Sequence, residues 1–342
     1  MIRLLSLIVA AVATTAAQAA PNDGDAAAAE ILNDIHAVNN LDKTLAFYHD
    51  VFGLDGQTQP ITSRGFPALT NSPGARLRLA VLHLPNTSFG LQLMEFSGVE
   101  RKPGRFGVSD PGASHLILRV RDLNRVVDAA KKSGAEIVTP SGAPVKLPPT
   151  AVGSSAILMR DPDGYLVEGE EVTSSNGSPS NGNVQSAGMR FAMADRNATL
   201  KFYGDLLGFK LAGGTEFRVN TAMTDFTGVP QGSQSRGLNV AAPGTNPLVF
   251  YEFKDLPQTR LHLHLPDPGV PAISFRVKDL DGLVKRMRAA RVPTVSADGK
   301  VVRFTPSARS ILVEDPNGIK VELYEALENV RNEKDLKHLP DK

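Results

Sequence analysis

The chain has 342 residues, of which 42% are hydrophobic and 21% are charged, and its 37 basic and 36 acidic residues leave a formal net charge of +1. This composition is globular, and the balanced charge argues against nucleic acid or an anionic membrane as the main partner. The absence of cysteine excludes disulfides, zinc–thiolate sites and thiol nucleophiles. At about 150 residues per domain, the length favours two domains.

The first 19 residues have the pattern of a secretory signal peptide. Arg3 precedes an apolar run at residues 4–16, and Ala17-Gln18-Ala19 supplies the small residues of a cleavage site. The apolar run is too short to span a bilayer. We therefore expect residues 1–19 to be removed and the mature protein to be periplasmic or secreted from a bacterium, with no membrane association.

Two halves of the remaining chain repeat each other head to tail. The matching segments are LAFYHDVFGL at 45–54 with LKFYGDLLGF at 200–209, RVRDL at 119–123 with RVKDL at 276–280, and DPDG at 161–164 with DPNG at 315–318. A stretch rich in Ser, Asn and Gly separates the halves and is typical of a linker. The predicted divisions are an N-terminal domain at 30–172, a linker at 173–185, a C-terminal domain at 186–326 and a charged tail at 327–342.

Each half contains a smaller repeat of one strand, one helix and three strands. Strand-to-helix junctions are predicted around Asn40 and Asp122, whose side chains can cap the helix that follows. Aliphatic and aromatic residues at helical spacing then predict amphipathic helices. Short strands follow, and in the first half they are expected at 76–84, 89–96, 154–160 and 165–172. The segments 57–75 and 139–153 are predicted to be loops that shape a pocket.

These motifs, in the same order in both halves, resemble the vicinal oxygen chelate superfamily over residues 31–326. That superfamily includes glyoxalase I, extradiol dioxygenases, and fosfomycin-resistance and bleomycin-binding proteins. The resemblance implies an α+β fold of tandem glyoxalase-like domains. In each domain, two βαβββ modules would form a curved mixed sheet around a cleft.

The resemblance also implies metal-ligand positions on the first and last strand of each module. In the first half these positions hold Asn33, Gln92, His115 and Glu168. Imidazole and carboxylate suit one divalent metal (Fe, Mn, Ni, Zn or Co), whereas the amides are weaker ligands. In the second half the positions hold Gly188, Val249, Ala272 and Glu322, so no metal is expected there.

Two further residues lie near these positions without sharing their face. Glu95 is three residues past Gln92, so strand alternation points it to the opposite side of the sheet. His36 is three residues past Asn33, and we expect it to be exposed to solvent. No residue is assigned a catalytic role, and no organic cofactor site is predicted.

Two functions of different classes follow from the resemblance. In the first, the N-terminal domain holds a metal that acts as a Lewis acid on a small molecule with adjacent oxygens, as a glyoxalase-like lyase or isomerase or as an extradiol-type dioxygenase. In the second, the protein binds and sequesters a small molecule without metal, like bleomycin-binding relatives. Internal duplication is compatible with either a monomer or a homodimer, and the substrate and reaction stay open.

Overall fold

The computed structural model describes residues 28–61, 63, 65–149, 151–173, 180–241, 248–305 and 307–327. The predicted signal peptide, residues 174–179 of the predicted linker and nearly all of the predicted tail lie outside these residues. Within them, no helix is long and apolar enough to cross a membrane.

The first half consists of two modules. Module 1 contains β1 (Ala28–Val38), α2 (Leu41–Phe47), which continues as the π-helix η1 (Tyr48–Phe52), β2 (Gly56–Ile61), α3 (Gly65–Leu69), β3 (Arg76–His83) and β4 (Gly90–Ser97). Module 2 contains β5 (Ser114–Val120), α4 (Leu123–Ser133), β6 (Val145–Lys146), β7 (Ser155–Arg160) and β8 (Leu166–Glu171). The segment 57–75, expected to be a loop, therefore holds most of β2 and the short helix α3.

The second half repeats this order. Module 3 contains β9 (Val184–Ala192), α5 (Arg196–Leu200), continuing as the π-helix η2 (Lys201–Leu206), β10 (Lys210–Ala212), β11 (Arg218–Val219), α6 (Thr221–Thr227), β12 (Gln234–Ala241) and β13 (Leu248–Phe253). Module 4 contains β14 (Pro271–Val277), α7 (Leu280–Ala289), the 3₁₀ turn η3 (Ala297–Gly299), β15 (Val302–Thr305), β16 (Ala308–Glu314) and β17 (Lys320–Ala326).

The helix boundaries follow the capping chemistry predicted from the sequence. The side chain of Asn40 accepts a hydrogen bond from the backbone N–H of Lys43 at the start of α2, and Asp122 does the same for Arg125 at the start of α4. Helix α4 ends at Ser133 and is capped by Gly134, which has a φ of 73°, a left-handed conformation that glycine adopts without strain.

The two sheets combine modules from different halves. In the described part of the chain, sheet 1 has the order β15-β16-β17-β14-β1-β4-β3-β2, and sheet 2 runs β10-β12-β13-β9-β5-β8-β7-β6 with β11 beside β12. At their centres, β1 pairs antiparallel with β14, and β5 pairs antiparallel with β9. The α+β tandem fold is confirmed, but each sheet joins module 1 to module 4 or module 2 to module 3, instead of the two modules of one half.

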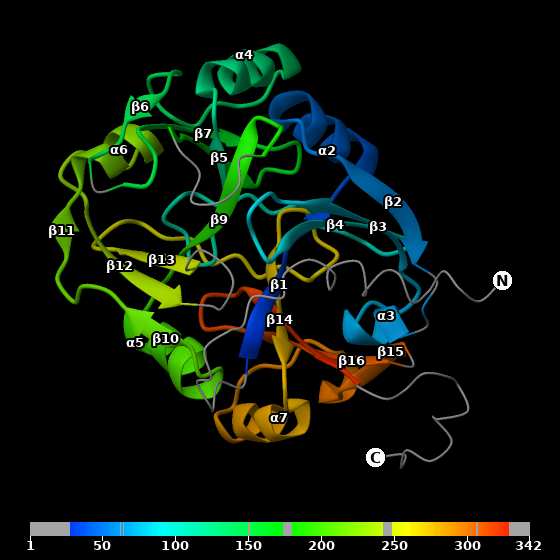
Figure 1. The fold of residues 1–342 in the computed structure, drawn as a ribbon. Helices are drawn as coiled ribbons and strands as arrows, with labels where there is room; N and C mark the ends of the chain where they lie inside the picture. The colour runs from blue at the N-terminus through cyan, green and yellow to red at the C-terminus, as the bar shows by residue number, and fades with distance from the viewer. Residues whose placement is uncertain are drawn as a thin grey trace.

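The helices hold each half together while the strands join the halves. Helix α2 with η1 packs beside α4, and α5 with η2 packs near α7 (Figure 1). The main apolar core lies between these helices and the sheets and includes Tyr48, Leu91, Tyr203 and Phe275. We call this side of each sheet its helix face and the opposite side its inner face.

Candidate binding sites on the inner faces of the two sheets

The four residues predicted to bind one metal are divided between the two sheets. Asn33 and Gln92 lie on β1 and β4 of sheet 1, whereas His115 and Glu168 lie on β5 and β8 of sheet 2. The single site expected for the first half is therefore wrong, because the modules of that half contribute to different sheets. Each pair of residues instead shares its sheet with two of the corresponding ligand positions from the second half. The combined sets are Asn33, Gln92, Ala272 and Glu322 in sheet 1, and His115, Glu168, Gly188 and Val249 in sheet 2.

In sheet 1, two amide side chains lack good hydrogen-bond partners. The Nδ2 of Asn33 donates to Ser274 Oγ across 3.4 Å, but its buried Oδ1 has no hydrogen-bond partner. This oxygen lies above Gly90, where an added Cβ would approach it to 3.2 Å. The Nε2 of Gln92 reaches only the thioether sulfur of Met94, at 3.2 Å, and a thioether is a weak acceptor.

The carboxylate of sheet 1 comes from β17. Oε1 of Glu322 accepts a hydrogen bond from Ser310 Oγ across 2.8 Å. Burial raises the pKa of Glu322, and this hydrogen bond opposes the increase. The spacing of the family motifs assigned the ligand position on β14 to Ala272. In the structure, Ser274 is the β14 residue that pairs with Asn33 on one side and with Glu322 on the other.

The side chains of sheet 1 do not fit a divalent metal. Two neutral amides, a methyl group and one hydrogen-bonded carboxylate supply too little negative charge and no imidazole. Nor does any cluster of three or more His, Asp or Glu residues suited to a metal occur in the described ranges.

In sheet 2, an arginine is bound to the predicted carboxylate ligand. Nη1 of Arg190, on β9, donates to Oε2 of Glu168, and the Arg190 guanidinium carbon lies 5.3 Å from the ring centroid of Tyr251. Arg190 lies directly opposite His115 in the β5–β9 pairing. Burial lowers the pKa of His115 well below its usual value, and the charge of Arg190 lowers it further.

A second buried arginine fills the space left by Gly188. Nε of Arg119 lies 2.9 Å from Oε2 of Glu170, and its Nη1 donates to the carbonyl of Ala187 across 3.3 Å. A Cβ added at Gly188 would come within 3.3 Å of that Nη1, so the guanidinium occupies the position expected for a ligand side chain. Burial raises the pKa of Glu168 above its usual value; Arg190 opposes this increase and the neighbouring Glu170 adds to it.

Sheet 2 also does not fit a metal at the predicted position. Glu168 is already paired with a cation, and Gly188 and Val249 offer no ligand atom from their side chains. The sequence-based prediction missed Arg119 and Arg190. A signal was present, because Arg190 is two residues past Gly188 and therefore on the same face of its strand.

Two residues near the predicted ligands have structural roles. Glu95 points to the helix face, as predicted, where its Oε2 accepts from the backbone N–H of Leu41 across 3.1 Å. The expectation that His36 is exposed is wrong, because its side chain is 0% exposed. Its ring stacks on Tyr165 with centroids 3.6 Å apart, and its nitrogens lie 3.5 Å from Asp34 and 3.9 Å from Asp161.

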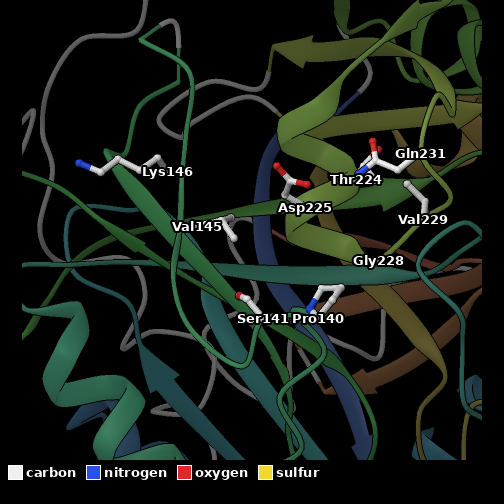
Figure 2. Close-up of a pocket in the computed structure, with 9 residues that line it drawn as sticks. All are labelled: Pro140, Ser141, Val145, Lys146, Thr224, Asp225, Gly228, Val229 and Gln231. Carbon is white, nitrogen blue, oxygen red and sulfur yellow. The ribbon is translucent and has the colours of Figure 1, made fainter.

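A hollow of about 590 Å³ lies between the two halves beside sheet 2. Figure 2 shows the segment carrying Val145 on one side and helix α6 with Asp225 on the other. Thr139 fixes this arrangement, since its Oγ1 donates to the carbonyl of Phe226 across 3.0 Å. The hollow is lined by Pro140, Ser141, Val145, Lys146, Thr224, Asp225, Gly228, Val229 and Gln231.

Comparison with known proteins agrees with this architecture. The family model described as "Glyoxalase/Bleomycin resistance protein/Dioxygenase superfamily" matches residues 33–168 and 189–323. Glyoxalase I from Zea mays is similar in structure, with a TM-score of 0.55 and 17% identity, covering 86% of this chain and 92% of that chain. A Bacillus subtilis protein named "putative dioxygenase" has a TM-score of 0.54 and 13% identity, covering 88% of this chain and 86% of that chain. No curated protein sequence matches the chain.

Proposed function

Because the chain belongs to the Glyoxalase/Bleomycin resistance protein/Dioxygenase superfamily, we propose that it is a metal-independent protein that binds a small molecule on the inner face of sheet 1. This is the second of the two functions expected from the sequence. The first required His115 and Glu168 to share a site with Asn33 and Gln92, and these pairs lie in different sheets.

The observation that carries the proposal is the unsatisfied Oδ1 of Asn33 beside Gln92, whose amide donates only to a thioether sulfur. A buried polar atom without a hydrogen bond costs about 1–3 kcal/mol, which a ligand can recover by supplying the missing partner. Oδ1 of Asn33 is such an atom, and the amide hydrogens of Gln92 are directed at a weak sulfur acceptor.

These groups favour an uncharged ligand with a donor and an acceptor close together. The ligand would donate to Oδ1 of Asn33 and accept from Nε2 of Gln92. The side chains of Leu79, Val81 and Met94, which belong to one apolar cluster on the same face, would contact its hydrocarbon part. Polar groups placed among apolar ones are typical of small-molecule sites.

Ligand binding can be tested with catechol, which carries two adjacent hydroxyl groups, and resorcinol, whose hydroxyl groups are separated. We expect catechol to raise the melting temperature of the wild type more than resorcinol does, and the effect to survive EDTA. Asn33→Leu should abolish it. Asn239→Leu, the same change on an exposed residue of sheet 2, should leave it intact.

Metal content provides the second arm of the test. We expect purified wild-type protein to contain far less than one divalent metal per chain, with no decrease in Glu322→Ala or His115→Ala. A stoichiometric metal that either substitution removes would overturn the proposal. If Glu322→Ala removes the metal, the effect of Asn33→Leu reflects a metal site in sheet 1; if His115→Ala removes it, the metal lies in sheet 2.

We also propose that the protein acts after export, on the basis of the pattern of residues 1–19. Intact mass measurement of protein from the periplasm and medium of a bacterial host should give a chain that begins at Ala20. A full-length chain confined to the cytoplasm would contradict export.

A further inference from the structure

We propose that Arg190 is a built-in cation that replaces a metal in sheet 2, and that its guanidinium masks a latent divalent-metal site formed by His115 and Glu168. This inference concerns the sheet opposite the proposed ligand site and does not depend on which molecule binds to sheet 1.

The position of Arg190 supports the replacement. Its guanidinium donates to Glu168, whose side chain is 1% exposed, and it comes from the strand residue directly opposite His115. An ionised carboxylate in a protein interior is strongly unfavourable unless a cation or hydrogen bonds compensate its charge. Arg190 supplies a positive charge to Glu168, and its strand position is directly opposite His115, the other ligand that the family resemblance implies.

The neighbouring side chains hold Arg190 in that place. The ring of Tyr251 lies 5.3 Å from the guanidinium carbon, which is within the range of a cation–π interaction. The second ion pair, Arg119 with Glu170, lies beside it and occupies the space above Gly188. Two guanidinium groups therefore balance two buried carboxylates without a metal.

The duplicated module provides an internal comparison. The residue of module 1 that matches Arg190 is Ile35, a buried apolar side chain, and the carboxylate of sheet 1 is bound by a serine hydroxyl instead of a cation. Sheet 1 also has no histidine at the position of His115, where Ala272 lies. The arginine therefore occurs in the sheet that keeps both the imidazole and the carboxylate.

Removing the guanidinium should leave Glu168 without its cationic partner, and both His115 and Glu168 available to a metal. The Nδ1 of His115 is buried and has no hydrogen-bond partner, and Glu168 Oε2 would lose its donor. Imidazole nitrogen and carboxylate oxygen are both good ligands for Zn²⁺, and water can complete the coordination. Methionine has a length similar to that of arginine but no charge, so Arg190→Met tests the idea directly.

The experiment compares full-length variants in the presence of ZnCl₂. The wild type should show no zinc-dependent rise in melting temperature, whereas Arg190→Met should show a rise that increases with zinc concentration. Calorimetry should detect one additional zinc per chain in this variant. Arg190→Lys keeps a cation and should behave like the wild type, and Arg190→Met/His115→Ala should lose the gain.

Folding controls keep the test decisive. Arg190→Met and Glu168→Gln should each lower the melting temperature, because each leaves one partner of a buried ion pair alone. The double variant Arg190→Met/Glu168→Gln should lose less stability than the sum of the two single losses. Additive losses, or a folded Arg190→Met that binds no more zinc than the wild type, would overturn the proposal. Metal found in the wild type but retained in His115→Ala would contradict the function proposed for sheet 1 while leaving this inference standing.

Discussion

The hydroxyl group of Tyr48 donates a hydrogen bond to Oδ2 of Asp161 across 3.2 Å, joining the helix of module 1 to the hairpin turn of module 2. The second half repeats the contact, with Tyr203 donating to Asp315 across the same 3.2 Å. The two motifs that reveal the duplication, F-Y and D-P-x-G, therefore bind each other within each half. Their repetition reflects folding and not a shared catalytic role.

Tyr48→Phe should destabilise the protein by about 1–3 kcal/mol, because Oδ2 of Asp161 would remain buried without this donor. Tyr203→Phe removes the equivalent hydrogen bond and should cost less, because Oδ2 of Asp315 still accepts a hydrogen bond from Nδ2 of Asn317 across 3.0 Å. Urea denaturation at neutral pH measures both. A change close to zero in both variants would show that the hydroxyl groups do not stabilise the turns.

Stability should decrease as the pH rises from about 4 to about 6 because of the two turn aspartates. Burial raises the pKa of Asp161 and of Asp315 from 3.8 to about 6. The folded state then holds these protons more tightly than the unfolded state does. The stabilisation is complete below the unfolded pKa and is lost as the pH rises through the folded pKa.

Asp315→Asn should remove the contribution of one group. We expect the free energy of unfolding of the wild type to fall between pH 4 and pH 7 by on the order of 1–3 kcal/mol more than that of the variant. Asp161→Asn provides the matched case, although the charges of His36 and Asp163 also act on that carboxyl group. Parallel pH profiles for the wild type and both variants would contradict the prediction.

The buried ring of His36 should be replaceable by another flat ring. His36→Ala removes the stack on Tyr165 and leaves a cavity, so we expect a loss of about 2–4 kcal/mol. His36→Phe should lose less than half of that, since phenylalanine occupies the matching position 191 of the second half. Urea denaturation gives both values. If the phenylalanine variant is as unstable as the alanine variant, then the imidazole nitrogens stabilise the cluster through Asp34 and Asp161.

A cut between the halves should not separate them. The halves share both sheets through the β1–β14 and β5–β9 pairings, so each half alone would expose a long unpaired strand edge. A protease site placed between Thr173 and Ser180 allows the test on folded protein. After cleavage, we expect a single peak in gel filtration at the elution volume of the uncut chain. Two smaller species would show that the pairing across the halves does not hold the protein together.

Much of the local structure was determined by the sequence. The strands expected at 76–84, 89–96, 154–160 and 165–172 correspond to β3, β4, β7 and β8. Asn40 and Asp122 cap the predicted helix starts, and D-P-x-G turns join β7 to β8 and β16 to β17. Alternation also placed Glu95 on the face opposite Gln92. These features depend on neighbours only a few residues away, which is why local patterns predicted them.

Only the tertiary structure decided which modules share a sheet, and with it which side chains share a site. The modules have similar strand patterns, so the residues of β1 suit pairing with a strand of its own half as well as pairing with β14. Helix packing within each half and strand pairing between the halves settle the choice over long distances. That choice separated His115 and Glu168 from Asn33 and Gln92 and brought Arg190 to the carboxylate that had been assigned to a metal.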